Sequence, residues 1–353
     1  MARTGRSARK LRRLALATAS ATMATLLVAP AAEAGADRLD PAALSRGPDP
    51  AITYLVRDTI RDGAARIPAT TRGRHEALWA VEGGYVVRDY NVGPRRLIRV
   101  TFIDPTGERR VIAQSRDWID VAVSDSGMRL AFRRPMGPTG QRSVVTVTDP
   151  AAGEVLAERT LRLANLVAVS DTRVLLGRRF HWHDPATQWW SYGRNRLHTL
   201  WNQAAVRADI GHDTVVFGTP AAGEFCNRVA VLSHPGRTLW RSCDTAPHQW
   251  SPDGTLALAT HAYFDAAGTD RWWVVEGRTA QRQAQIIGRL DWDAVWEDDG
   301  HFLTLAQSDT GRAAIVRCDV SGACERASRV WEVPLPSEPS LYYQSPPVVL
   351  AQR

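Results

Sequence analysis

After residue 34 the sequence lacks any apolar run long enough to cross a bilayer, and it lacks long segments with helical periodicity. It also has no Gly-x-Ser-x-Gly, no His-Glu-x-x-His and no glycine-rich phosphate loop. These absences exclude helical bundles and the enzyme classes that such motifs identify. With 44% hydrophobic and 23% charged residues, the composition is that of a globular protein, which excludes disorder, collagen and coiled coil as descriptions of the whole chain.

The first 34 residues have the pattern of a secretory signal peptide. Six basic residues within positions 3–13 precede an apolar stretch from Leu14 to Pro30, and Ala32-Glu33-Ala34 precedes Gly35. We therefore expect an exported protein, secreted or associated with the cell envelope, with cleavage before residue 35. A retained membrane anchor is the alternative, and Arg12-Arg13 leaves the choice between the Sec and twin-arginine routes open.

Removal of this segment changes the charge of the chain. The full sequence carries a formal net charge of +7, but residues 1–34 contribute six basic residues and only one acid, Glu33, so about +2 remains. The remaining arginines alternate with acids and form no basic stripe. The sequence therefore predicts no nucleic-acid partner.

Four cysteines suit an oxidising compartment and predict two disulfides. Three pairings are possible, and we expect Cys226 with Cys243 and Cys318 with Cys324, because each pair lies symmetrically about a turn. Opposed residues of a hairpin have about the Cα separation that a disulfide requires. Catalytic or metal-binding use would require pairs to converge in space without close sequence spacing.

A unit of 40 to 46 residues recurs along the chain, and its marker is an apolar strand that ends in an Asp or Gly turn before a second strand. Six copies are visible, the first at Leu78–Gly84, and the turn aspartates of the others stand at positions 125, 171, 213, 253 and 299. A second kind of turn follows in several units, as in Asp104-Pro105-Thr106-Gly107. Four short strands per unit with tight turns predict propeller blades.

The two ends of the chain add further strands to this pattern. Runs at 52–60 and 64–68 form a hairpin pattern around Asp62-Gly63, and 340–344 and 347–351 could be two more strands. A ring must hide its seam, so we expect these strands to combine into a closing blade. The prediction is an all-β, monomeric, single-domain propeller over residues 52–353, with 35–51 as an N-terminal extension. Seven blades of four antiparallel strands are expected, and six is the alternative.

One repeat carries a recognisable motif. Trp250-Ser251-Pro252-Asp253-Gly254, followed by an apolar strand, resembles the WD40-like repeat of TolB-type β-propellers, and degenerate copies stand at 124–127 and 297–300. The motif has a structural basis, because Pro sets φ, Asp caps the turn and Gly accepts a left-handed conformation. The resemblance implies an exported scaffold that binds a partner through one ring face or its centre, although the additional N-terminal domain of TolB has no counterpart here.

Two similar segments, 180–190 and 263–273, supply the candidate binding residues. Exposed rings there could stack on sugars or anchor a protein partner, whereas packing between blades is the alternative role. His181 and His183 alternate on an extended strand and would project from one side as metal ligands do, although a polar surface loop is the alternative that Asp184-Pro185 favours. The candidate ligand-binding residues are Trp182, Trp189, Trp272, His181 and His183.

The recurring turn aspartates can also be interpreted as carboxylates around a channel, but their position in every unit favours turn caps. We therefore predict no catalytic residues, no metal site and no cofactor. The expected function is that of an exported binding or scaffold protein of the cell envelope or extracellular space, with a protein as partner. The alternatives are a glycan-binding protein and a propeller hydrolase or lyase that acts on wall or extracellular polysaccharide, with a site assembled from several blades.

Overall fold

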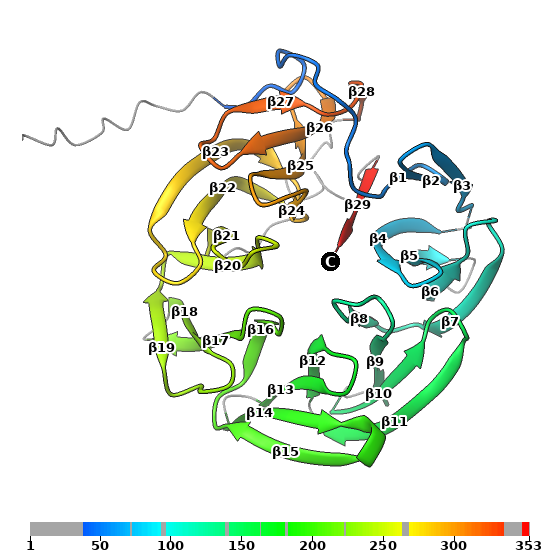
Figure 1. Cartoon of the computed structure of the whole chain (residues 1–353), viewed down its shortest axis with the longest axis vertical. Coiled ribbons are helices and arrows are strands. Elements are labelled where there is room, and N and C mark those ends of the chain that lie inside the picture. Colours follow the sequence, from blue (N-terminus) through cyan, green and yellow to red (C-terminus); the bar gives the residue numbers. More distant parts are fainter. Residues whose placement is uncertain are drawn as a thin grey trace, which may run out of the picture. The chain divides into compact units, whose positions relative to one another are not determined.

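A computed structural model describes residues 38–70, 73–92, 97–137, 141–162, 164–180, 183–221, 224–262, 268–334 and 348–352. The chain divides into two compact units, Met1–Ala36 and Asp37–Arg353, and the described residues all belong to the second. Its strands are arranged as a ring of antiparallel sheets (Figure 1). The predicted all-β fold of four-stranded antiparallel sheets is confirmed.

The described strands fall into seven sets, which we number in the order in which they follow one another around the ring. Set 1 joins the two ends of the described chain and contains β29 (Val348–Gln352), β1 (Tyr54–Val56), β2 (Thr59–Asp62) and β3 (Ala65–Pro68). Set 2 contains β4 (Arg74–Val81), β5 (Gly84–Val92), β6 (Leu97–Ile103) and β7 (Arg109–Ser115). Set 3 contains β8 (Asp120–Val123), β9 (Leu130–Met136), β10 (Arg142–Asp149) and β11 (Glu154–Arg162).

The remaining sets repeat this order. Set 4 contains β12 (Ala164–Val169), β13 (Val174–Phe180), β14 (His183–Ser191) and β15 (Arg196–Trp201), with a 3-10 helix η1 (Tyr192–Arg194) before β15. Set 5 contains β16 (Ala205–Asp209), β17 (Thr214–Ala221), β18 (Glu224–Val231) and β19 (Thr238–Ser242). Set 6 contains β20 (Thr245–Trp250), β21 (Leu256–His261), β22 (Thr269–Glu276) and β23 (Arg282–Leu290). Set 7 contains β24 (Val295–Trp296), β25 (His301–Gln307), β26 (Arg312–Asp319), β27 (Cys324–Arg326) and β28 (Trp331–Glu332).

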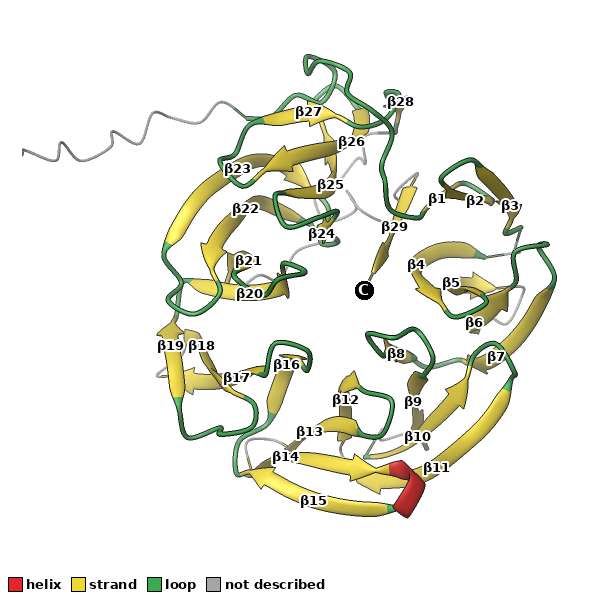
Figure 2. Ribbon diagram, in the orientation of Figure 1, coloured by secondary structure: helices red, strands yellow, loops and turns green. Residues whose placement is uncertain are grey.

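The C-terminal strand joins the two ends of the ring. β29 pairs antiparallel with β1, with Tyr54 opposite Leu350, and runs parallel to β4, where Ala351 lies opposite Leu78. The strand therefore lies on the inner side of the N-terminal hairpins, in the middle of the view in Figure 2. The seven sets agree with the expected seven blades, and the number of blades itself stays a prediction.

Apolar cores between neighbouring sets hold the ring together. Each of the seven buried clusters takes side chains from two neighbouring sets, including the cluster between set 7 and set 1 that contains Trp331 and Leu350. Burial of each large side chain stabilises the fold by about 1.5–3 kcal/mol. Both faces of a sheet are covered by neighbours, and consequently Val, Leu and Trp occur on both faces of the strands.

The turns after the inner strands are built as the repeat motif predicts. In Ser251–Gly254, the Gly254 N–H donates to the Ser251 carbonyl at 2.8 Å, and Gly254 has a φ of 72° that suits glycine. The Asp253 carboxylate accepts the Ser251 hydroxyl at 2.6 Å and the Thr255 N–H at 3.0 Å. Asp253 therefore stabilises the turn from within.

These turns also connect neighbouring sets on one face of the ring, which we call the turn face. The connecting hydrogen bonds are Glu82 N–H to Gly127 O at 3.0 Å, Ser126 hydroxyl to Asp171 Oδ1 at 2.6 Å, His212 Nε2 with Pro252 O at 3.0 Å, and Asp253 N–H to Asp299 Oδ1 at 2.9 Å. The recurring motif consequently sets the local turn and the spacing of adjacent sheets.

Several local expectations are refined by the structure. The run 52–60 is broken at Arg57, whose φ is 52°, into the separate strands β1 and β2. The N-terminal extension contacts sets 6 and 7, because the Leu39 N–H donates to the Ile287 carbonyl of β23 at 2.8 Å and Arg46 forms a β-bridge with Arg326 of β27. The expected strand 340–344 lies outside the described residues, whereas β29 occupies 348–352.

Both predicted disulfides are present. Cys226 is bonded to Cys243 and Cys318 to Cys324. Cys318 and Cys324 are directly opposed across β26 and β27, as expected for a bridge within a hairpin. No helix within the described part of the chain has the length and apolarity that a membrane span needs.

Candidate functional site

The structure places the tryptophans that were expected to bind a ligand inside the protein. Trp272 is 0% exposed and Trp189 is 8% exposed. Their neighbours in sequence, Trp273 and Trp190, are also buried, and the two rings of each pair lie in different cores between sheets. Packing between neighbouring sheets, the alternative role, accounts for all four rings, so Trp189 and Trp272 cannot stack on a ligand in this structure.

The reason for this burial is the alternation of side chains along a strand. Adjacent residues point to opposite faces of a sheet, and in a ring each face is covered by a neighbouring sheet. The two pairs also occupy different registers, because Trp190 lies opposite Val174 at the start of β13, whereas Trp273 lies opposite Ala259 within β21. The similar sequences of the two segments therefore do not mark equivalent positions.

The other predicted ligand-binding residues are not tested. His181 and Trp182 lie outside the described residues. His183 begins β14, with its backbone opposite Phe180, and its side chain is outside the description. Among the described residues, no group of three His, Cys, Asp or Glu side chains has an arrangement that could hold a metal ion.

The turn aspartates divide into two kinds. The Asp253 carboxylate accepts the Ser251 hydroxyl and backbone N–H groups within its turn, and these hydrogen bonds lower its pKa. The same arrangement lowers the pKa of Asp104 and Asp319 in the second kind of turn, where the hydroxyls of Thr106 and Ser321 are the main donors. These three carboxylates cap their turns, a role that the sequence predicted for Asp253.

Asp125 departs from the predicted capping role. In the turn 124–127 the residue that corresponds to Asp253 is Ser126, whose Oγ accepts the Met128 N–H at 3.1 Å, and Asp125 occupies the position of Pro252. Its side chain is therefore not needed by the turn. Burial and the Asp209 carboxylate raise its pKa.

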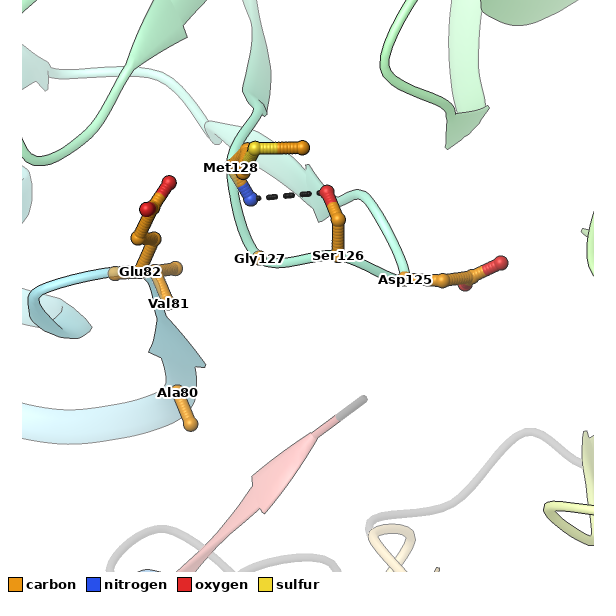
Figure 3. Close-up of a pocket in the computed structure, with 7 residues that line it drawn as sticks. All are labelled: Ala80, Val81, Glu82, Asp125, Ser126, Gly127 and Met128. Carbon is orange, nitrogen blue, oxygen red and sulfur yellow. Dashed lines mark hydrogen bonds between the residues drawn. The ribbon is translucent and has the colours of Figure 1, made fainter.

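A shallow pocket of about 450 Å³ lies on the turn face between the turns of set 2 and set 3. Figure 3 shows Glu82 and Met128 on facing turns, whereas Asp125 points away from both. Val81 and the backbone at Gly127 complete the wall. The pocket offers one carboxylate and an apolar side chain, without a second polar group aimed at a common point.

A second group of polar residues converges at the middle of the ring, and the sequence does not reveal it. Its members come from the inner strands or adjacent residues of sets 1, 2, 3, 5, 6 and 7, which surround the ring axis in Figure 1. We define the axial cluster as Glu76, Arg88, Asp120, Arg207, His248, Asp291, Asp293 and Gln352. Arg88, Glu76 and Arg207 act electrostatically on the Asp293 carboxylate, although more than 80 residues separate each of them from Asp293 in sequence.

Two aspartates in the segment before β24 form the acidic part of this cluster. Burial and the neighbouring Asp293 carboxylate raise the pKa of Asp291 to about 7. Burial also raises the pKa of Asp293, although Arg88 and the Gln352 side-chain amide oppose this effect. The Trp292 N–H donates to Asp291 Oδ1 at 2.7 Å. Because the two carboxyl groups repel each other's ionisation, the pair holds a proton near neutral pH.

Arg207 supplies a cation on the opposite side of the cluster. Its side chain is exposed to solvent, and its one hydrogen bond among the described residues runs from Nη1 to the His248 carbonyl at 3.5 Å. Surrounding protein nevertheless lowers the pKa of Arg207 to about 10, against the effect of Asp293.

His248 forms the wall behind this cation. Burial, with the charge of Arg207, lowers the pKa of His248 well below its usual value, so the ring is neutral. Nε2 lies 2.8 Å from Thr260 Oγ1, and the imidazole stacks on Trp292 with ring centroids 5.8 Å apart. The Trp272 Nε1–H donates to the Asp291 carbonyl at 3.2 Å, so a tryptophan expected to bind ligand instead supports the axial aspartates.

Set 2 contributes an ion pair and an aromatic ring at the edge of the cluster. Arg88 Nε lies 3.6 Å from Glu76 Oε2, and its guanidinium carbon lies 4.2 Å from the centroid of Trp118. Trp118 is 41% exposed, which is unusual for so large an apolar side chain. The axial cluster thus combines cations, carboxyl groups and an accessible aromatic surface, which are the elements of a polar binding site.

The sequence did not predict this cluster, because most of its residues lie far apart in the sequence and follow no repeated spacing. The one local signal is Asp291-Trp292-Asp293, in which two acids flank an aromatic residue just before a repeat turn.

Comparisons with known proteins identify a fold and no family. No protein-family model matches the chain, and no curated protein matches its sequence. TolB from Acinetobacter baumannii is 14% identical with a TM-score of 0.47, over 73% of this chain and 67% of that one. The β-propeller domain of the Trilobed protease from Pyrococcus furiosus is 10% identical with a TM-score of 0.48, over 73% and 84%.

An acylaminoacyl peptidase, solved in complex with Z-Gly-Gly-Phe-chloromethyl ketone, is 11% identical with a TM-score of 0.53. The match covers 77% of this chain but only 47% of that chain. At such identities a likeness concerns the fold alone. The strand pairing shows a β-propeller, and TolB is among the solved structures to which the chain is similar.

Proposed function

We propose that the chain is an exported binding or scaffold protein of the cell envelope or extracellular space, and that its partner is a protein that contacts the axial cluster. The observation that supports this proposal is the convergence of charged side chains from several sheets at the ring axis. Arg207 has one long hydrogen bond among the described residues, and the Asp291–Asp293 pair has no cation of its own within 4 Å there.

The physical argument concerns the cost of burying charge. Burying charged groups without close partners costs several kcal/mol, so such groups are retained where a ligand completes their interactions. Trp118 and Val206, which are 41% and 39% exposed, add apolar surface of the kind that anchors a protein partner. The signal-like residues 1–34 and the two disulfides support export.

The test is a pull-down with the purified segment 35–353 from cell-envelope extract, under non-reducing conditions. A specific partner should be recovered by the wild-type protein and lost by the double variant Arg207→Ala, Asp293→Asn. Arg237→Ala is the matched control, because Arg237 is an exposed arginine on the turn face. Equal recovery by the axial variant and the control contradicts the proposed site.

The axial acids also favour a second candidate, a propeller hydrolase or lyase acting on wall or extracellular polysaccharide. Such an enzyme needs a general acid and a general base close together, and Asp291 and Asp293 are two neighbouring carboxyl groups of the type that serve in these roles. His248 is the described histidine at this position, and His181 and the His183 side chain lie outside the described residues. Release of reducing ends or unsaturated sugars from insoluble wall, abolished in Asp291→Asn and retained in Asp253→Asn, would support the enzyme; no release by the wild-type protein would reject it.

A further inference from the structure

A buried histidine joins the N-terminal hairpins to the ring. His75 lies on β4 with a side chain that is 8% exposed, between a carboxylate of its own sheet and one of set 1. Its Nδ1 lies 2.6 Å from Asp89 Oδ1, and its Nε2 lies 3.2 Å from Asp58 Oδ1. Asp89, on β5, is 0% exposed, whereas the side chain of Asp58, in the turn between β1 and β2, is 55% exposed.

The chemistry of this arrangement requires a charged imidazole. A neutral histidine has a single N–H and can donate to only one of the two carboxylates, whereas the imidazolium donates to both. Burial of the His75 ring lowers its pKa, but the contacts with Asp89 and then Asp58 outweigh burial, and the pKa is raised. Asp58 and Asp89 are the charged groups among the described residues that act on the ring.

The position of His75 in the ring gives this proton a structural consequence. Among the described residues, the strand pairing of set 1 with set 2 comprises two residue pairs between the parallel strands β29 and β4, Ala351 with Leu78 and Gln352 with Trp79. The Tyr85 hydroxyl also donates to Asp62 Oδ2 across this junction, at 2.7 Å. The contact between His75 and Asp58 is a direct polar link across the same junction, and the apolar cluster that contains Leu55, Ile60 and Leu78 lies between these sets. A change at His75 therefore acts on the place where the ring closes.

We propose that His75 is a proton-operated clasp that holds the N-terminal hairpins against the ring when it is charged and releases Asp58 when it is neutral. On deprotonation the remaining N–H stays with the buried Asp89, because loss of that contact would leave an uncompensated buried carboxylate. Asp58 can turn to solvent at little cost. This proposal does not depend on the proposed binding of a protein partner. His75 is adjacent in sequence to Glu76 of the axial cluster.

The direction of the pH effect follows from linkage. Because the folded-state pKa of His75 is raised above its usual value of 6.5, the clasp contributes fully below about pH 6.5 and is lost as the pH rises through the folded value. The hairpins β1 to β3 should therefore open more often in mildly alkaline than in mildly acidic solution.

Hydrogen exchange measured by mass spectrometry on the segment 35–353 between pH 5.5 and 8.5, corrected for intrinsic exchange, tests the proposal. Peptides from 54–68 should lose protection about tenfold as the pH rises, as expected for loss of one charge-assisted hydrogen bond. Peptides from 205–242, in set 5, should keep theirs. Equal loss in both regions, or no loss in 54–68, overturns the clasp.

Variants separate His75 from other titrating groups. Asp58→Asn removes a half-exposed charge, and it should shift the transition of 54–68 to lower pH. His75→Gln should abolish the transition, whereas His198→Gln, at an exposed position on β15, should leave it unchanged.

If His75→Gln does not fold, NMR titration of the His75 ring in the wild type and in Asp58→Asn gives the decision. A midpoint above 6.5 that falls in Asp58→Asn supports the clasp. A midpoint that does not move contradicts it.

Discussion

The aspartates of the turns and the aspartates at the ring axis differ although they are the same residue type in the same fold. Hydrogen bonds from turn hydroxyls and N–H groups lower the pKa of Asp253 and Asp319. The negative charge of each carboxylate is therefore stabilised within its own turn. Burial and mutual repulsion raise the pKa of Asp291 and Asp293. The turn aspartates have their donors within a few residues, whereas Asp293 depends on Arg88, Arg207 and the Gln352 side-chain amide from other sheets.

This difference separates carboxylates with a structural role in their turns from carboxylates that are candidates for binding a ligand. A residue whose donors lie in its own turn is explained by the turn, and it needs no partner. A residue that is desolvated without a close cation weakens the fold, and several such residues at one place make a candidate functional site. Substitutions that affect stability and binding differently test this distinction.

The largest expected effect is that of Trp272→Ala, in the wall behind the axial aspartates. Loss of this buried ring should lower the free energy of unfolding by about 3–5 kcal/mol. Trp272→Phe should cost less, because it keeps most of the packing and removes only the hydrogen bond to the Asp291 carbonyl. Denaturant unfolding measures both. A cost below about 1 kcal/mol for the alanine variant would show that the ring is not part of the structural core.

Asp291→Asn should increase stability at alkaline pH. The wild-type carboxyl keeps its proton in the folded state up to about pH 7 but ionises near pH 3.8 when unfolded, so wild-type stability falls as the pH rises between these values. The amide cannot ionise, and at pH 8 the variant should be more stable on the order of 2 kcal/mol. Unfolding at pH 4.5 and pH 8 measures the slope. Asp244→Asn, at an exposed position, is the control, and a wild-type slope in Asp291→Asn would contradict the assignment.

Asp253→Ala should lower the free energy of unfolding, in contrast to Asp291→Asn, and by a smaller amount. Loss of the turn cap should cost about 1 kcal/mol at neutral pH, and Asp253→Asn should recover most of it through Oδ1. Because the pKa of Asp253 is lowered, its contribution is present above the unfolded-state value and is lost as the pH falls through the folded-state value. Thermal unfolding should therefore show a larger difference between wild type and Asp253→Ala at pH 7 than at pH 2.5.

Arg207→Ala should have the smallest effect on folding. The side chain is exposed and makes one long hydrogen bond, so the free energy of unfolding should change by less than about 0.5 kcal/mol. Binding of the partner recovered in the pull-down should nevertheless weaken at least tenfold, since Arg207 is the cation that the axial cluster presents to solvent. A change in stability without a change in binding would assign Arg207 to the fold.

The sequence predicts what depends on neighbouring residues. The turn of Ser251–Gly254, the hairpin positions of Cys318 and Cys324, and the repeat spacing all follow from local geometry. The axial cluster could not be predicted in this way, because its members meet only when separate sheets close around an axis. The prediction that Trp189 and Trp272 are exposed was wrong for a related reason. The sequence places one ring of each tryptophan pair on each face of a strand, but it does not show that neighbouring sheets cover both faces.

The inner position of β29 also constrains the order in which the ring can be completed. β29, which links β1 to β4, follows every other described strand in the sequence. β1 and β4 therefore cannot pair with it until almost the whole chain has been synthesised. During synthesis, the inner edges of β1 and β4 lack their β29 partner until residues 348–352 are made. A chain interrupted before residue 348 would therefore keep both edges open to pairing with other molecules.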